Sequence, residues 1–152
     1  MADLLVPLYG LPDTVCPVGY TVRRPMASEG TDLQAWIEAA FSRGWASEVL
    51  PGLSATPPSV FIAVHNTDSS PAGFCCWDCT ALGFLGPVGV AGEHRGNGLG
   101  RALALSVLHS MREQGYGYAV VGDAGPADFF SRVCGATVIP GSKPGIYRQR
   151  IR

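Results

Sequence analysis

The stretch Val88–Leu103 reads VGVAGEHRGNGLGRAL and carries glycine at three alternate positions, Gly96, Gly98 and Gly100. Arg95 precedes these glycines, and an apolar helical pattern follows them. The first N–H groups of a helix have no partner within the helix, and glycine lets a ligand lie directly on them. The helix dipole also favours an anion at this end. The stretch therefore predicts a helix N-terminus that binds a phosphate-containing ligand.

Two other phosphate-binding patterns do not fit this stretch. A nucleotide P-loop needs GxxxxGK followed by Ser or Thr, and the sequence has no such string. A dinucleotide fingerprint needs a third glycine where Arg101 stands, and the preceding strand closes a meander instead of opening a βαβ unit. The remaining alternative is a plain turn in which glycine breaks a helix, but such a turn does not need three alternate glycines between two arginines.

Composition predicts a single folded domain. Of 152 residues, 47% are hydrophobic and 15% are charged, which suits one well-buried core. The net charge is −1 and the basic residues are scattered, so there is no electrostatic case for a nucleic-acid partner. No apolar run reaches the roughly 18 residues that span a bilayer. The start MADLLVPLYG lacks the basic residues of a signal peptide. We therefore expect a cytoplasmic protein without a membrane partner.

The five cysteines, Cys16, Cys75, Cys76, Cys79 and Cys134, are expected to be free thiols. Cys76 and Cys79 have CxxC spacing, which is common in metal sites. However, their segment reads as a strand, and positions three apart on a strand point to opposite faces. A second Cys or His pair is also missing. The sequence therefore predicts no metal site, with cysteine acting as a small hydrophobic residue.

The elements alternate in a pattern typical of an α+β domain. Residues 1–18 are rich in Pro and Gly and are expected to form an irregular lead-in to one domain over residues 19–152. The order β, α, α, three strands, α, β, α, β, β predicts a mixed, mostly antiparallel sheet. Strands are expected at 20–24, 59–64, 73–79, 83–90, 116–122, 137–140 and 145–151, and helices from 31, at 47–50, at 98–114 and at 126–134.

The glycine segment resembles a known signature. Arg95-x-x-Gly98-x-Gly100 is similar to the acyl-CoA motif R/Q-x-x-G-x-G/A of the GCN5-related N-acetyltransferase (GNAT) superfamily. The flanks are similar too: a strand ends in Val-x-Val, Glu93 stands two residues before the arginine, and a long amphipathic helix follows.

The resemblance continues downstream. Asp123, Phe130 and Gly135 resemble the superfamily's N-x-x-A-x-x-F-Y…G segment. The order of elements also agrees, so the resemblance covers roughly residues 20–152. It implies a GNAT-like sheet of about seven strands with about four helices, splayed between the fourth and fifth strands.

The resemblance also implies where acetyl-CoA binds. The pantetheine arm lies in the splay and pairs with the fourth strand, here Pro87–Val90, and the pyrophosphate lies on the amides of the glycine segment. The implied contacts are Val88, Gly89, Val90, Arg95, Gly96, Asn97, Gly98, Leu99, Gly100, Arg101, Ala102, Asp123 and Phe130.

The implied activity is N-acetyl transfer from acetyl-CoA to a primary amine, on a small molecule or a peptide, by direct attack on the thioester. No metal is implied, and a homodimer is compatible with the resemblance. The alternative is a non-catalytic acyl-CoA-binding module. A nucleotide-binding protein is a third reading, and it would need to bind nucleotide better than CoA.

Transfer to an amine requires a base, because a lysine-like amine has a pKa of about 10.4 and must lose a proton. The candidate bases are Asp78, Glu93, His65 and Asp123. Asp78 is an acid within an apolar strand, so it faces either solvent or the substrate cleft. Of the four, Asp78 and Glu93 are the expected catalytic residues, whereas His65 ends a strand at a polar turn and is expected to be exposed.

The other two catalytic needs are an oxyanion donor and a proton for the departing thiolate. A backbone N–H near Val90 can serve as the donor. The family's usual acid is a tyrosine, and the aligned residue here is Phe130, which has no proton to give. The substitutes are Ser131, Cys134, Tyr147 or water, and a thiolate with a pKa near 8.5 is a fair leaving group by itself.

Overall fold

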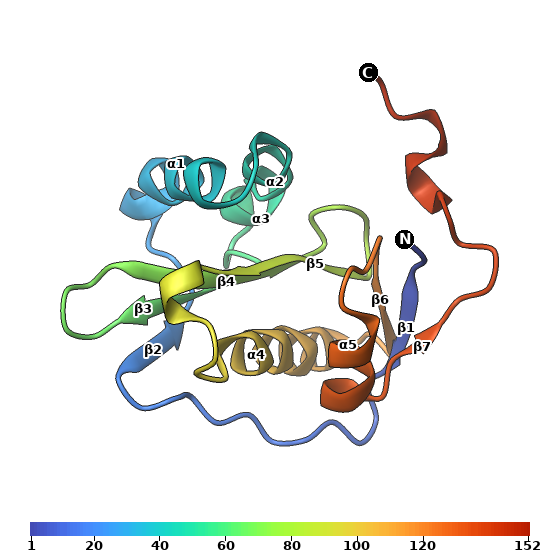
Figure 1. Ribbon diagram of the computed structural model, residues 1–152, viewed down its shortest axis with the longest axis horizontal. Helices are drawn as coiled ribbons and strands as arrows, with labels where there is room; N and C mark the ends of the chain where they lie inside the picture. The colour runs from blue at the N-terminus through green and yellow to red at the C-terminus, as the bar shows by residue number, and fades with distance from the viewer.

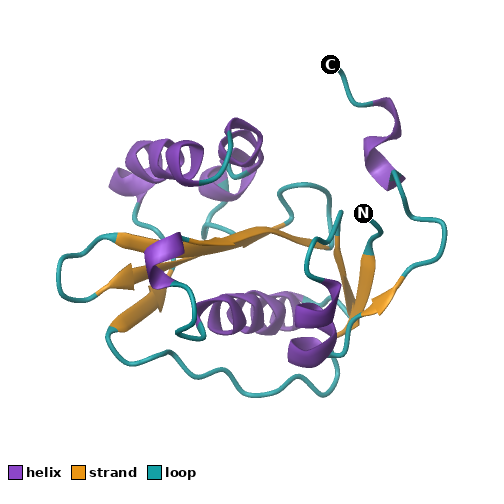
Figure 2. Cartoon of the chain, in the orientation of Figure 1, coloured by secondary structure: helices purple, strands orange, loops and turns teal.

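The computed structural model describes residues 1–152 and contains one seven-stranded sheet with the order β2-β3-β4-β5-β6-β1-β7. Helices α1–α3 cover one face of the sheet, and α4 and α5 cover the other (Figure 1; Figure 2). The strands are β1 (Leu4–Pro7), β2 (Tyr20–Arg23), β3 (Val60–His65), β4 (Pro71–Trp77), β5 (Phe84–Val90), β6 (Tyr118–Val121) and β7 (Thr137–Val138). The helices are α1 (Gly30–Ala40), α2 (Arg43–Glu48), α3 (Leu50–Ser54), α4 (Leu99–Gln114) and α5 (Ala127–Cys134).

Strand pairing confirms the predicted α+β class with a mixed, mostly antiparallel sheet. Every neighbouring pair of strands is antiparallel except β5 and β6, which run parallel. No helix is both long and apolar enough to cross a membrane.

The expectation of an irregular lead-in over residues 1–18 is wrong for its first part. Leu4, Val6 and Leu8 are almost completely buried, whereas Leu5 between them is partly exposed. This alternation has the period of a strand with one buried face. The resulting β1 lies antiparallel between β6 and β7 and completes the second half of the sheet. Residues 8–19 contain no helix or strand.

The last expected strand, residues 145–151, is also wrong. Residues Gly145–Gln149 form a 3-10 helix, in which Tyr147 N–H donates to Pro144 O at 3.2 Å and Arg150 N–H donates to Tyr147 O at 3.1 Å. The chain therefore satisfies these backbone groups locally, without a neighbouring strand. The sheet still has seven strands because β1, which the sequence analysis missed, adds the seventh.

The core has two parts, one on each face of the sheet. The larger cluster packs α4 and α5 against one face, and Leu103, Leu108 and Met111 of α4 are completely buried there. The smaller cluster packs α1–α3 against the other face and includes Ile37 and Phe74. Strand β4 is buried on both faces, which explains its continuous apolar run FCCW.

The sheet opens between β5 and β6, as the resemblance implied. These strands pair at two positions, Phe84 with Val120 and Leu85 with Val121. Strand β6 ends at Val121, whereas β5 continues beyond Leu85 to Val90 without a partner on this side. Because neither strand pairs with the other after this point, the edge of β5 is free to accept a ligand.

The cysteines depart from the prediction at one point. No group of three His, Cys, Asp or Glu side chains could hold a metal ion. However, the expectation that Cys76 and Cys79 point apart is wrong. Strand β4 ends at Trp77, and Asp78 has a φ of 54°, in the left-handed region. The chain therefore turns before Cys79, whose thiol packs on the same face as Cys76.

Candidate functional site

The glycine segment presents a row of unpaired backbone donors at the start of α4. Gly96 and Gly98 have φ values of 82° and 81°, a conformation that favours glycine. The first helical bond of α4 runs from Ala102 N–H to Gly98 O at 3.1 Å. The six N–H groups from Gly96 to Arg101 donate to no acceptor in the chain. Six free donors at the positive end of a long helix form an anion-binding surface.

Side chains hold this segment in place. Tyr20 from β2 shares a hydrogen bond of 2.8 Å with His94 Nδ1, and the Asn97 amide donates to His94 O at 3.0 Å. Arg95 Nε donates to Val90 O at 3.2 Å, and Arg101 is exposed on the first turn of α4. Two guanidinium groups therefore add positive charge beside the free amides.

The free edge of β5 follows from the strand register. Ala91 N–H donates to Ala72 O on β4 at 2.8 Å. Backbone groups alternate in direction along an antiparallel strand, so the N–H and C=O groups of Val90 and Val88 point away from β4 and into the splay. The bond from Arg95 to Val90 O agrees with this direction.

Two glycines of the predicted site have different neighbours. A Cβ on Gly100 would lie 3.4 Å from the Phe129 ring, so this residue faces the space between α4 and α5. A Cβ on Gly89 would lie 2.7 Å from the Phe41 ring and 2.9 Å from Trp45. Because Gly89 has no side chain, Phe41 and Trp45 can pack directly against it on the face covered by α1–α3. Only the backbone of Gly89 borders the splay.

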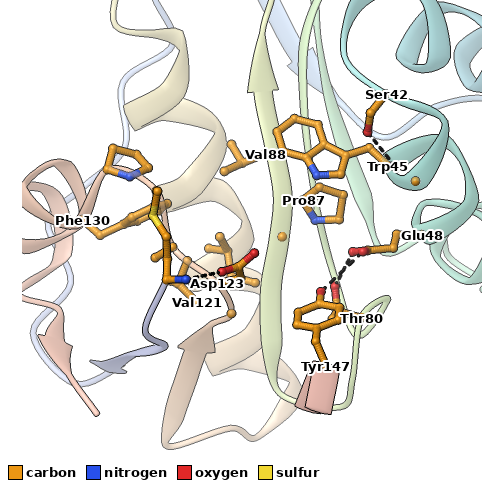
Figure 3. Close-up of a pocket in the computed structure, with 18 of the residues that line it drawn as sticks. Ser42, Trp45, Glu48, Thr80, Pro87, Val88, Val121, Asp123, Phe130 and Tyr147 are labelled. Carbon is orange, nitrogen blue, oxygen red and sulfur yellow. Dashed lines mark hydrogen bonds and ion pairs between the residues drawn. The ribbon is translucent and has the colours of Figure 1, made fainter. Parts of the chain in front are cut away.

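A cavity of about 770 Å³ occupies the splay. Its walls are Leu85–Val88 of β5, residues 121–126 at the end of β6, Phe130 of α5, the end of α2 and the C-terminal segment. Figure 3 shows Trp45, Glu48, Thr80 and Tyr147 on one side of β5, with Asp123 and Phe130 on the other. The cavity thus meets the free edge of β5 at Val88.

A hydrogen-bonded acid lies in this cavity. Thr80 donates its hydroxyl to Glu48 Oε2 at 2.7 Å, and the Tyr147 hydroxyl lies 3.4 Å from Glu48 Oε1 (Figure 3). Burial raises the pKa of Tyr147, and the negative charge of Glu48 raises it further. Tyr147 therefore keeps its proton at neutral pH. Sequence reasoning missed Glu48, because nothing in its local sequence places α2 over the splay.

The four acids and bases named from sequence are not brought together. Asp78 lies outside the cavity, and its Oδ1 accepts from Gly83 N–H at 2.7 Å and from the Tyr116 hydroxyl at 2.8 Å. This carboxylate closes the β4–β5 turn, so the expectation of a cleft base is wrong for Asp78. Glu93 is exposed on the 3-10 helix Gly92–His94, outside the cavity.

The remaining two candidates have partners of their own. His65 lies 3.2 Å from Asp68 at the end of β3, outside the cavity. Asp123 does line the cavity, and its carboxylate lies 2.8 Å from the Met1 amino group. Among the candidate bases named from sequence, Asp123 is therefore the one that the structure places at the cavity.

Phe130 forms an apolar wall of the cavity. Its side chain is 1% exposed and packs edge-to-face on Phe129, with 5.0 Å between ring centroids. Ser131 is exposed outside the cavity, and the Cys134 thiol donates to Phe130 O within the core. Of the three side chains considered as substitute acids, Tyr147 is the one that lines the cavity.

The chain matches the Acetyltransferase (GNAT) family over residues 29–135. The GCN5-related N-acetyltransferase of Sphaerobacter thermophilus is similar in fold, with a TM-score of 0.73, 21% identity, and coverage of 91% of this chain and 48% of that one. A GCN5-related glucosamine N-acetyltransferase region of a fungal multi-domain GH3 β-N-acetylglucosaminidase gives a TM-score of 0.71, 18% identity, and coverage of 91% and 19%.

A GNAT family N-acetyltransferase from Escherichia coli, solved in complex with CoA, gives a TM-score of 0.51, 20% identity, and coverage of 69% of this chain and 63% of that one. No curated protein matches the chain. The chain spans less than half of the length of the Sphaerobacter protein and about a fifth of the fungal one. At these identities the solved structures show a shared fold.

Proposed function

Because the chain belongs to the GNAT family of acetyltransferases, we propose that it is an acetyl-CoA-dependent N-acetyltransferase that acts on a primary amine by direct attack on the thioester. One observation carries the proposal: six unpaired amides at the start of α4 and the free edge of β5 border the same opening of the sheet. An acyl-CoA needs both, since its pyrophosphate is an anion and its pantetheine arm carries amide groups.

The pyrophosphate would be held by the amides from Gly96 to Arg101, and the pantetheine amides would pair with Val88 and Val90. Without a ligand, Arg95 Nε donates a hydrogen bond to Val90 O. Pairing of a ligand with Val90 would release this guanidinium, which is then free to turn toward the phosphates. Arg95 thus couples the two halves of the proposed binding site.

For the transfer itself, we assign the base to Glu48. The amine attacks the thioester carbon, the new C–N bond forms, and the amine proton passes to the Glu48 carboxylate. The free N–H of Val90 or of Val88 stabilises the oxyanion. Thr80 and Tyr147 hold the carboxylate in place. The C–S bond then breaks, and the thiolate leaves without a protein acid because its pKa is near 8.5.

The second candidate function is a non-catalytic acyl-CoA-binding module. Phe130 favours it, because a buried benzyl ring stands where the family's usual acid is expected. The two functions differ in one product: an enzyme forms an acetylated amine and free CoA, whereas a binding module leaves acetyl-CoA intact.

Calorimetry with acetyl-CoA and mass spectrometry of a panel of primary amines test the proposal together. We expect Gly100→Val to abolish measurable binding, because its side chain would fill the space between the start of α4 and Phe129 of α5, beside the free amides. Gly117→Val is the matched control, since a Cβ there meets nothing within 4 Å and the residue lies far from the cavity at the other end of α4. Unchanged affinity in Gly100→Val would place the site elsewhere.

A further inference from the structure

The Cys76–Cys79 pair is a cluster of nucleophilic side chains that the proposed reaction does not use. Cys76 is on β4, opposite Val60 of β3, and is completely buried in the smaller core cluster. Cys79 follows the left-handed residue Asp78 and is partly exposed. The turn places both thiols in the smaller core cluster, where each shifts the pKa of the other.

The surroundings of Cys79 are shaped around its sulfur. A Cβ at position 52 would lie 2.7 Å from Cys79 Sγ and 3.2 Å from Ser59 Oγ. The absence of a side chain on Gly52 therefore leaves the space that the sulfur fills. The Gly52 backbone and the Ser59 hydroxyl lie beside this sulfur, and hydrogen bonding with them helps to lower the pKa of Cys79. A sulfur that accepts several hydrogen bonds is stabilised as a thiolate.

The two thiols are consequently unequal. Hydrogen bonds from Cys76, Gly52 and Ser59 lower the pKa of Cys79 although the residue is partly buried. Burial raises the pKa of Cys76 well above its ordinary value. A partly exposed thiol with a lowered pKa beside a buried thiol with a raised pKa is the arrangement of a peroxide-reactive cysteine and its resolving partner.

We propose that Cys76 and Cys79 are a redox modification site that forms a reversible intramolecular disulfide with a peroxide as oxidant. The Cys79 thiol loses its proton and the thiolate attacks one peroxide oxygen; the O–O bond breaks, Cys79 becomes a sulfenic acid, and the departing hydroxide takes up that proton and leaves as the first water. The Cys76 sulfur then attacks the Cys79 sulfur, loses its proton, and expels the second water. Two thiols and one hydrogen peroxide thus give one disulfide and two waters.

The neighbouring Cys75 is excluded as the partner by the strand geometry. Its side chain points into the larger cluster on the opposite face of β4. The disulfide would also act on the cavity. Cys76 Sγ lies 3.6 Å from Pro87 O, and Pro87 lines the cavity. Thr80, which follows Cys79, donates to Glu48. Oxidation would remove the contact between Cys76 and Pro87. It would also shift Thr80 and therefore its hydrogen bond to Glu48.

Peptide mapping tests this proposal independently of any acetyltransferase activity. The full chain carrying Cys16→Ser, which removes the exposed thiol, is treated with hydrogen peroxide, and the remaining thiols are alkylated under denaturing conditions. We expect loss of two hydrogen atoms from the intact mass, a disulfide between Cys76 and Cys79 in the digest, and full return of both thiols after reduction.

Two variants test the proposal separately from any change of fold that oxidation causes. Cys79→Ser should leave Cys76 fully alkylated after peroxide. Ser59→Ala should slow the oxidation several-fold, because the thiolate loses one donor, while circular dichroism reports the fold of both variants. The proposal is overturned if Cys76 stays alkylatable in the parent chain under conditions that oxidise Cys79, or if Cys75 carries the disulfide.

Discussion

Truncation of the Phe130 ring gives a prediction whose size follows from the structure. The ring is 1% exposed within the larger core cluster and packs edge-to-face on Phe129. Removing a buried phenyl group loses its transfer free energy and leaves a cavity, which together lower the free energy of unfolding by about 3–5 kcal/mol. A domain with a typical stability of about 5–15 kcal/mol would still fold unless it lies at the lowest end of that range. We therefore expect Phe130→Ala to be folded but clearly weakened.

The opposite expectation holds for Phe130→Tyr. The ring lines a cavity of about 770 Å³, so an added hydroxyl can reach water there. We expect the free energy of unfolding to change by less than about 1 kcal/mol, since the hydroxyl avoids the about 1–3 kcal/mol penalty of an unsatisfied buried group. Phe74→Tyr is the matched control, because Phe74 is completely buried in the other cluster and does not line this cavity. This control should show the full penalty.

Urea denaturation followed by circular dichroism measures all three variants, and product formation measures turnover. If thiolate departure limits the rate, the restored hydroxyl in Phe130→Tyr should raise turnover with almost unchanged affinity for acetyl-CoA. A Tyr variant as destabilised as Phe74→Tyr would refute the reasoning, because the para position would then point into the core. A loss below about 1 kcal/mol in Phe130→Ala would show that the ring is not packed as described.

Three further substitutions have defined outcomes. Glu48→Gln should lower kcat about 10²–10⁴-fold with little change in acetyl-CoA affinity by calorimetry, because a base is lost and the shape is kept. Tyr147→Phe should lower kcat less than Glu48→Gln does, since Thr80 still holds the carboxylate, and an equal loss would make Tyr147 itself the catalytic group. Gly89→Ala should lower the free energy of unfolding by about 1–3 kcal/mol in a urea titration, because its Cβ would overlap the Phe41 ring, and an unchanged midpoint would contradict this contact.

The features that the sequence predicted correctly are local ones. The glycine segment and the helix behind it depend on backbone conformation within a few residues, so their pattern in Val88–Leu103 is readable without the rest of the chain. The Leu99, Leu103, Val107 and Met111 seam of α4 is buried as its spacing predicts. The alternation of Leu4, Val6 and Leu8 also predicts strand β1. However, the Pro and Gly content of residues 1–18 led to the expectation of an irregular segment.

The features that sequence reasoning missed depend on contacts between distant segments. Asp78 sits in an apolar run and suggests a buried base, yet its role is set by Gly83 and Tyr116, which no local pattern links to it. The same residue breaks the strand, so a rule for regular strands fails at Cys79. A regular strand over Cys76–Cys79 would place the two side chains on opposite faces. The left-handed φ of Asp78, which lies between them, turns the chain and makes this expectation wrong.

The two ends of the chain together explain why the candidate base escaped detection. Because β1 supplies the strand between β6 and β7, the C-terminal segment is not needed in the sheet and folds as a 3-10 helix against the cavity. That position brings Tyr147 to Glu48, 99 residues earlier in the sequence. If β1 and this segment are linked in this way, loss of β1 pairing should disturb the cavity as well as the sheet.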